Sequence, residues 1–219
     1  MNEPIQLHYL PGAASMAPHA VLVELGLPHR LVMVDRSAQG AATPEYLRLN
    51  PLGRVPTVVD GHMVLTESAA ICMHYADAHP GAGLAPPPAT RDRAEWFRWH
   101  CHLTNTVQPT FMRFRYPHRV LPAGAGPEME AAVATRAEEE LGTLGDLVAA
   151  HLADRTWMVG DAFGTVDVWL CMVTRWTRWL GHPWWARPAI AAHFRRVADR
   201  PALRLVWERE GLDRDGEPA

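Results

Sequence analysis

Residues 50–68 read NPLGRVPTVVDGHMVLTES, and this stretch decides how the first part of the chain folds. Two short apolar runs, residues 55–59 and 62–65, flank an Asp-Gly pair, and a two-residue link of this kind predicts an antiparallel β-hairpin. Ser68 follows soon after the second run and is a favourable N-cap for a helix. The stretch therefore predicts two strands followed by a helix.

The residues before this stretch predict a strand, a helix and a second strand. Residues 5–10 roughly alternate apolar and polar side chains, as a strand does, and a Pro-Gly pair ends the run. Apolar residues then recur at helical spacing from Ser15 to Gly26, and residues 30–35 form another apolar run. A strand, helix and strand in this order imply a right-handed crossover between parallel strands. The complete order, βαβ followed by ββα, is that of a thioredoxin-like α/β domain.

Beyond residue 80 the character of the sequence changes. Residues 80–90 are rich in Pro, Gly and Ala and include three consecutive prolines, which indicates a linker. Apolar residues then recur at helical spacing, and residues 166–179 are apolar on most faces, as in a helix at the centre of a bundle. We expect a thioredoxin-like domain at residues 1–80, a linker at 81–93 and an all-α helical bundle domain at 94–219.

Composition narrows the classes of function. The 219 residues carry a net charge of -3, so no overall attraction to nucleic acid or to an anionic membrane is expected. All 21 basic residues are arginine, which excludes a Schiff-base lysine. Cys72, Cys101 and Cys171 form no C-x-x-C pair, and each is expected to be a small buried side chain. Without a basic leader or an apolar run of about 18 residues, a cytoplasmic protein with no membrane span is expected.

The stretch 50–68 resembles the glutathione S-transferases, in which a cis-proline opens the third strand and a Glu-Ser pair opens the third helix. A cis bond before Pro56 turns the N–H and C=O of Val55 away from the sheet, where an extended peptide can pair with them. Ser68, at a helix N-terminus, favours an anionic partner. The resemblance implies that this partner is the γ-glutamyl carboxylate of glutathione, that Glu67 faces its amine, and that Arg54 belongs to the same site.

The resemblance extends over nearly the whole chain. Residues 9–19, YLPGAASMAPH, and residues 83–86 resemble the bacterial beta class, and residues 157–167 resemble the folding motif of the family's helical domain. In that motif Asp167 is expected to accept a hydrogen bond from the backbone N–H of Gly164, where the family usually has Ser or Thr.

The candidates for activating glutathione are Ser15 and Tyr9. The beta class carries a cysteine where this chain has Ala14, so chemistry through a mixed disulfide is disfavoured. A free thiol has a pKa of ~8.5, and a hydrogen bond to a charged group, worth ~1.5–3 kcal/mol, lowers that pKa by roughly one to two units. Serine does this in other classes of the family, which makes Ser15 the leading catalytic candidate. The structural alternative is that Ser15 only caps a helix.

The resemblance also suggests which other residues complete the site. Asn105 falls where the beta class has a histidine that contacts the thiol, and Gln39 falls roughly where that class has a lysine. The electrophile is expected to lie against the first long helix of the second domain. The candidate residues of this electrophile pocket are Trp99, His102, Phe111, Arg115 and Tyr116.

The expected protein is a homodimeric glutathione S-transferase that adds the glutathione thiolate to a hydrophobic electrophile. Glutathione is the co-substrate, and no metal is expected because His100 and His102 are two residues apart and point to different sides of a helix. Two alternatives stay open. One is another glutathione-dependent reaction at the same site, such as ether cleavage, dehalogenation or isomerisation. The other is non-catalytic binding of glutathione or a hydrophobic ligand.

Overall fold

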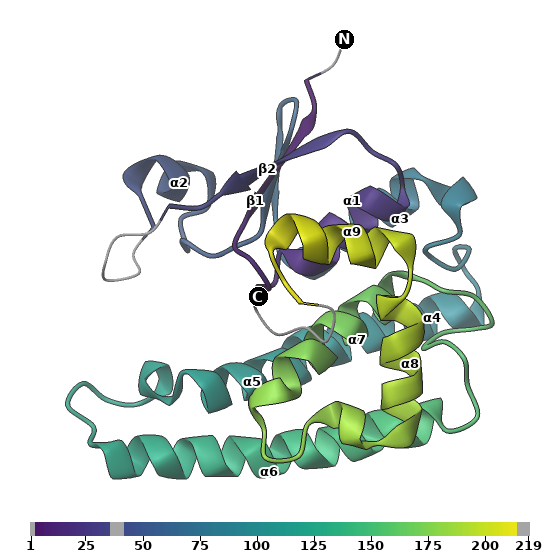
Figure 1. Ribbon diagram of the computed structural model, residues 1–219. Coiled ribbons are helices and arrows are strands. Elements are labelled where there is room, and N and C mark those ends of the chain that lie inside the picture. Colours follow the sequence, from purple (N-terminus) through teal and green to yellow (C-terminus); the bar gives the residue numbers. More distant parts are fainter. Residues whose placement is uncertain (1–2, 36–41, 214–219) are drawn as a thin grey trace. The chain divides into compact units, whose positions relative to one another are not determined.

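The computed structural model describes residues 3–35 and 42–213. The chain divides into two compact units, one formed by Met1–Ala85 together with Ala198–Ala219 and the other by Pro86–Val197 (Figure 1). The fold class expected from the sequence, a thioredoxin-like domain and an all-helical domain, is confirmed. Within the described ranges we find no helix with the length and apolar character that crossing a membrane would need.

A four-stranded mixed sheet forms the centre of the first unit. β1 (Ile5–Tyr9) pairs in parallel with β2 (His29–Met33) and antiparallel with β3 (Thr57–Asp60), which pairs antiparallel with β4 (Met63–Thr66). The spatial order is therefore β2-β1-β3-β4. The predicted hairpin is confirmed, and its Gly61 has a φ of 56°, in the left-handed region that glycine adopts without a steric penalty.

The helices after β1 and after β4 were predicted from the sequence, whereas the short helix before β3 was not. α1 (Met16–Glu24) joins β1 to β2, α2 (Pro44–Leu49) precedes β3, and α3 (Ser68–Ala78) follows β4, before the short turn η1 (Pro80–Ala82). α1 packs against α3, and every residue of its first two turns is buried. This burial explains why α1 has apolar side chains around its whole circumference.

The C-terminal helix α9 (Pro201–Glu210) belongs to the first unit, whereas the sequence analysis placed it in the helical domain. α9 packs against α1 (Figure 1). Arg200, just before α9, donates from its guanidinium to both carboxylate oxygens of Glu24 at 2.6 and 2.9 Å. An apolar helix face shows that the helix packs against something but not against what, so the sequence pattern could not assign α9 to a unit.

Residues 86–197 of the second unit form helices and connecting loops. α7 (Thr165–Trp176) is its interior helix, with all of its residues buried, as the apolar run predicted. The other elements are α4 (Arg91–His102), the π-helical turn η2 (Leu103–Val107), α5 (Gln108–Arg115), η3 (Pro117–Val120), α6 (Pro127–Leu152), η4 (Thr177–Trp179), η5 (Trp184–Ala186) and α8 (Pro188–Ala198).

A proline explains the π-helical turn between α4 and α5. Pro109 has no N–H to donate to the Asn105 carbonyl, and its ring would clash with that carbonyl in a regular helix. The chain widens there, and the Gln108 N–H bonds to the Leu103 carbonyl five residues back. The turn leaves Asn105 exposed.

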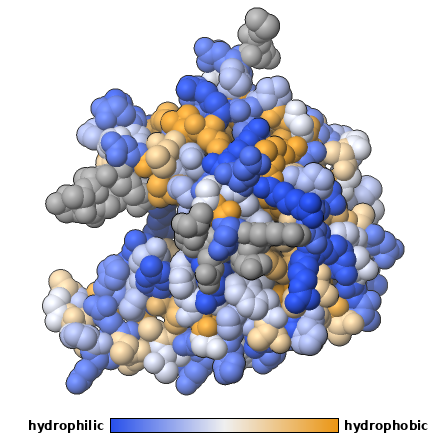
Figure 2. Space-filling model, viewed as in Figure 1, coloured by the Kyte–Doolittle hydropathy of each residue, from blue (hydrophilic) through white to orange (hydrophobic). Residues whose placement is uncertain are grey.

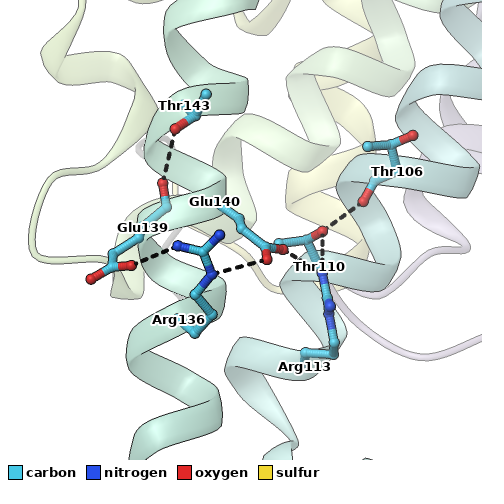
Figure 3. Close-up of polar contacts among 7 residues, drawn as sticks. All are labelled: Thr106, Thr110, Arg113, Arg136, Glu139, Glu140 and Thr143. Atoms are coloured by element: carbon cyan, nitrogen blue, oxygen red, sulfur yellow. Dashed lines mark hydrogen bonds and ion pairs between the residues drawn. The ribbon is translucent and has the colours of Figure 1, made fainter.

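Side-chain ion pairs join α5 to α6 (Figure 3). Arg113 on α5 donates to Thr110 Oγ1 at 3.0 Å and forms an ion pair with Glu140 on α6. Arg136 on α6 pairs with Glu139 at 3.0 Å and with Glu140 at 3.4 Å. Both arginines therefore have carboxylate partners.

Asp167 holds the start of α7 in place. Its carboxylate accepts hydrogen bonds from the Met158 N–H at 2.8 Å and from the Gly164 N–H at 2.9 Å, and His193 Nε2 lies 2.8 Å away. The bond to Gly164 is the one predicted from the sequence, while the contacts with Met158 and His193 were not predicted. One buried carboxylate therefore joins the loop before α7, the first turn of α7 and α8.

We predict that Asp167→Ala lowers the free energy of unfolding of the protein by about 3 kcal/mol or more, because it leaves several buried donors without an acceptor. Thermal or urea unfolding followed by circular dichroism measures the loss. Asp161→Ala is the matched control, since Asp161 is exposed, and its effect should stay within about 0.5 kcal/mol. Equal stability of the two variants would contradict the anchoring role.

Candidate functional site

Three segments of the first unit end at the same edge of the sheet. Thr57, the first residue of β3, pairs with His8 near the end of β1 and with Thr66 at the end of β4. β3 runs antiparallel to both neighbours, so the loop after β1, the Val55–Pro56 bond before β3 and the Glu67–Ser68 pair after β4 leave the sheet at one edge. The register of the strands therefore brings together three segments that the sequence analysis identified separately.

The Val55–Pro56 peptide bond is cis, as the resemblance implied. Within the described chain, no hydrogen bond engages the N–H or C=O of Val55. The preceding carbonyl, that of Arg54, accepts from the Tyr46 hydroxyl at 2.6 Å and from the Asn50 amide at 2.7 Å. The Val55 backbone groups therefore lie available at the sheet edge, in a loop that is held from two sides.

The sequence analysis assigned no role to Tyr46 or Asn50. The signal for Asn50 was present, because asparagine in a turn commonly bonds to nearby backbone, and Asn50 Oδ1 also accepts from the Leu52 N–H at 3.1 Å. Tyr46 carried no such local signal. Its hydroxyl also lies 2.9 Å from Thr57 Oγ1, a contact that only the tertiary fold creates.

Glu67 and Ser68 form a sharp bend between β4 and α3. Glu67 has a φ of 66°, a value that non-glycine residues rarely adopt, and such backbone strain is commonly found at functional sites. Ser68 is buried, and its hydroxyl donates to the Ala14 carbonyl at 2.8 Å. At the N-terminus of α3 the free groups are backbone N–H donors, and no acidic side chain occupies its first turn. Ser68 can therefore offer an anion its backbone N–H, while its hydroxyl is already engaged.

Ser15 closes the loop between β1 and α1 by bonding to the backbone of Leu10. The Ser15 hydroxyl donates to the Leu10 carbonyl at 3.1 Å and accepts from the Leu10 N–H at 3.3 Å, and the side chain is fully buried. Ser15 is the N-cap residue of α1, yet its side chain makes no capping hydrogen bond. The sequence-based expectation was a hydroxyl presented to the glutathione sulfur, but this hydroxyl points inward. Ala14 and Tyr9 are partly exposed.

A buried carboxylate from α9 holds the same loop. Glu210 Oε2 accepts a hydrogen bond from the Gly12 N–H at 2.8 Å, and Glu210 Oε1 lies 2.8 Å from His19 Nδ1 of α1. The side chains of His19 and Glu210 are both fully buried. The sequence analysis assigned no role to Glu210, because nothing in the neighbouring Arg and Glu residues indicates that one carboxylate turns inward.

Both parts of the chain match known domains. The glutathione S-transferase N-terminal domain matches residues 4–77, and the glutathione S-transferase C-terminal domain matches residues 104–201. Glutathione S-transferase GST-4.5 of Xanthomonas campestris is 34% identical over 213 residues, which cover 95% of this chain and 100% of that protein. The chain belongs to the glutathione S-transferase family.

Other relatives and solved structures of this family agree over nearly the full length. Glutathione S-transferase GstA of Escherichia coli O157:H7 is 29% identical, over 95% of this chain and 100% of that protein. A sphingomonad glutathione S-transferase, solved in complex with glutathione, is 31% identical with a TM-score of 0.79, and the glutathione S-transferase of Xylella fastidiosa is 30% identical with a TM-score of 0.85. Each alignment covers 95% of this chain and 100% of the other. The prediction of a glutathione S-transferase is confirmed.

Trp99 and Phe111, which were expected to line the electrophile pocket, lie in the core of the second unit. Trp99 is 1% exposed and packs against His151 at 4.5 Å between ring centres. Phe111 is 4% exposed and stacks on Trp176 at 5.4 Å. Their helical spacing on α4 and α5 reflects packing within the helical unit, so they present little surface to a ligand.

The remaining candidates have more exposed positions. Arg115 is exposed, and His102 and Tyr116 are partly buried. Burial, and then the neighbouring Arg98, lower the pKa of His102, which favours its neutral form. Asn105 is exposed, and its amide oxygen accepts from the Thr104 hydroxyl at 3.2 Å. Gln39 lies outside the described residues. Among the residues that are described, no group of three His, Cys, Asp or Glu side chains could hold a metal ion.

We predict that Glu210→Ala destabilises the protein by about 3 kcal/mol and loosens the loop between β1 and α1. The substitution removes the acceptor of the Gly12 N–H and the contact that the buried His19 imidazole makes at 2.8 Å. Chemical denaturation measures the loss, and hydrogen exchange should show faster exchange of the Gly12 amide.

Glu208→Ala is the matched control, because Glu208 lies on the same helix and is exposed. Its effect should stay within about 0.5 kcal/mol. If Gly12 exchange were the same in both variants, the carboxylate would not hold the loop.

Proposed function

We propose that the chain binds glutathione at the shared sheet edge and transfers its thiolate to a hydrophobic electrophile. The observation that carries this proposal is the register in which Thr57 pairs with both His8 and Thr66, because it brings three segments of complementary chemistry to one edge. The sphingomonad relative solved with glutathione supports the choice of ligand.

Each segment has a distinct role in the proposed complex. The N–H and C=O of Val55 pair with the cysteinyl backbone of glutathione, as one strand pairs with another. The backbone N–H of Ser68 donates to the γ-glutamyl carboxylate at the positive end of α3, and the exposed Glu67 carboxylate faces the γ-glutamyl amine. Arg54, whose side chain is exposed, is the neighbouring cation for the second carboxylate of the tripeptide.

Activation of the thiol is proposed to rest on backbone donors at the start of α1. Within the described chain no hydrogen bond engages the N–H of Ala14 or Ser15, and both groups lie at the positive end of a helix. Donation to the sulfur favours the thiolate and so lowers the pKa of the bound thiol. The thiolate then attacks the electrophilic carbon, forming a C–S bond while a leaving group departs or a conjugated double bond takes the electron pair. In this scheme Ser15 is a positioning residue that shapes the loop through Leu10.

We predict that glutathione bound to the protein has a thiol pKa well below ~8.5. Ultraviolet thiolate absorbance followed against pH measures this value. Ser15→Ala should keep the lowered thiol pKa, because both N–H donors remain, while the protein loses about 1 kcal/mol of stability. Tyr9→Phe should also leave the thiol pKa unchanged.

Other results of these measurements would assign the activation of the thiol to a different group or refute the proposed function. A thiol pKa that returns to ~8.5 in Ser15→Ala would assign the activation to the serine hydroxyl, as first expected from the sequence. The same result in Tyr9→Phe would assign it to tyrosine. Failure of the wild-type protein to bind glutathione would refute the proposed function.

A second candidate function follows from Ala14 and the inward Ser15 hydroxyl. A site without a side-chain group facing the sulfur suits a protein that binds glutathione with little turnover. Tight binding with an unshifted thiol pKa would favour this role. Ether cleavage, dehalogenation and isomerisation use the same thiolate and are separated by assaying each reaction directly.

We also propose a class within the family and a cellular location for this protein. We infer a beta-class relationship from residues 9–19, with Ala14 in place of the class cysteine, and a beta-class structure from Sphingomonas chungbukensis at 28% identity and a TM-score of 0.80 is consistent with it. A cytoplasmic location is supported by Cys72, Cys101 and Cys171, which are all free, as is usual in a reducing compartment.

We predict a homodimer, which sedimentation equilibrium would measure as about twice the mass of 24.4 kDa. Exposed apolar side chains support association, and apolar residues are visible on the surface in Figure 2. Leu52 is 69% exposed and Val64 46% exposed on the first unit, while Phe97 is 45% exposed on the second. A monomer at micromolar concentration would contradict the prediction.

A further inference from the structure

The hydroxyl of Tyr46 bonds to the residues on both sides of the Val55–Pro56 segment. It donates to the carbonyl of Arg54, just before the segment, at 2.6 Å, and it lies 2.9 Å from Oγ1 of Thr57, just after the segment. A phenol has one hydrogen to donate and a carbonyl oxygen can only accept, so the Thr57 hydroxyl is the donor of the second bond. The two bonds therefore form a chain from Thr57 through Tyr46 to Arg54.

The Tyr46 side chain is itself held in place. It is 5% exposed, and its backbone N–H bonds at 3.3 Å to Oγ1 of Thr43, the N-cap of α2. Its ring lies 5.5 Å from the ring of His8 on β1. His8 stands directly opposite Thr57 in the register of β1 and β3, so these two side chains share one face of the sheet. The hydroxyl of Tyr46 is therefore fixed by α2 and by β1 together.

Asn50 supports the same loop in a different way. Its amide donates to the Arg54 carbonyl at 2.7 Å, and its Oδ1 accepts from the Leu52 N–H at 3.1 Å. Both of these contacts precede Val55 in the chain. A tyrosine that only satisfied the Arg54 carbonyl would duplicate the Asn50 amide. The bond from Thr57 is what Tyr46 adds, because it links the two ends of the segment.

We propose that Tyr46 is a positioning residue for glutathione, whose hydroxyl aims the N–H and C=O of Val55 at the cysteinyl backbone of the ligand. This inference rests on the proposed function of the shared sheet edge. Strand-like pairing needs a donor and an acceptor directed at one partner. A segment that is fixed before the ligand arrives loses less conformational freedom on binding. Tyr46 acts through Val55, so it changes the affinity for glutathione and leaves the pKa of the bound thiol unaltered.

Isothermal titration calorimetry of the full chain with glutathione tests this role. Tyr46→Phe keeps the ring and removes the hydroxyl, and the Arg54 carbonyl keeps its bond to Asn50. We expect glutathione to bind this variant about tenfold more weakly, which equals about 1.4 kcal/mol. The pKa of the bound thiol, followed by thiolate absorbance, should stay at the wild-type value, because the N–H donors at the start of α1 are unchanged.

Thr57→Val provides a second variant with a milder change. Valine keeps the shape of the side chain and removes only the bond from Thr57 to Tyr46, while Tyr46 still donates to Arg54. The loss of one neutral hydrogen bond should weaken glutathione binding about threefold. Wild-type affinity in Thr57→Val would contradict the proposal that the segment is held from both ends.

Tyr75→Phe is the matched control. The Tyr75 side chain is 3% exposed, and its hydroxyl donates at 3.1 Å to the carboxylate of Asp60, at the opposite end of β3. This variant also loses a tyrosine bond to β3 and some stability, but its affinity for glutathione should equal that of the wild-type protein. Wild-type affinity in Tyr46→Phe, or an equal loss in Tyr75→Phe, would overturn the positioning role and leave the glutathione function intact. Failure of the wild-type protein to bind glutathione would refute both.

Discussion

The position of β3 between β1 and β4 is the constraint on which the rest of the first unit depends. A strand that runs antiparallel to both neighbours begins where they end, so Thr57 faces His8 and Thr66 at one edge of the sheet. The loop after β1, the Val55–Pro56 bond and the start of α3 must then share that edge. Both α1 and α3 begin there, so their positive ends face the same region. The proposed site for an extended, anionic peptide uses this shared edge of the sheet.

Buried carboxylates carry out the same task in each unit. Glu210 holds the Gly12 N–H and lies against His19, and Asp167 holds the Met158 and Gly164 N–H groups and lies against His193. A carboxylate can accept several hydrogen bonds at once, which allows it to join segments that are distant in sequence. Burial makes each such group costly to leave unsatisfied, so each network fixes its segments in one arrangement.

The loop before α1 is held in place by two serine hydroxyls that bond to its backbone. Ser15 is bonded in both directions to Leu10, and Ser68 is bonded to Ala14. These bonds engage the side-chain hydroxyls, whereas the N–H groups of Ala14 and Ser15 take part in no hydrogen bond within the described chain. The use of arginine in place of lysine has a consequence in the second unit, since only a planar cation can stack against Tyr116 and Trp179 as Arg115 does.

The sequence by itself determined the order of strands and helices in the first unit apart from α2 and α9, the helical nature of the second, the hairpin, the buried α7 and the Gly164–Asp167 bond. These features depend on periodicity and on contacts between residues a few positions apart, which a local pattern contains. It also predicted the candidate site segments at Val55–Pro56 and Glu67–Ser68, because a short motif carries them. Only the tertiary structure decided that α9 belongs to the first unit, that the Ser15 hydroxyl is buried, and that Trp99 and Phe111 are core residues. It also placed Glu210 on Gly12, a residue 198 positions away. A side chain's partner at such a separation depends on how the whole chain packs, and no local pattern of residues contains that information.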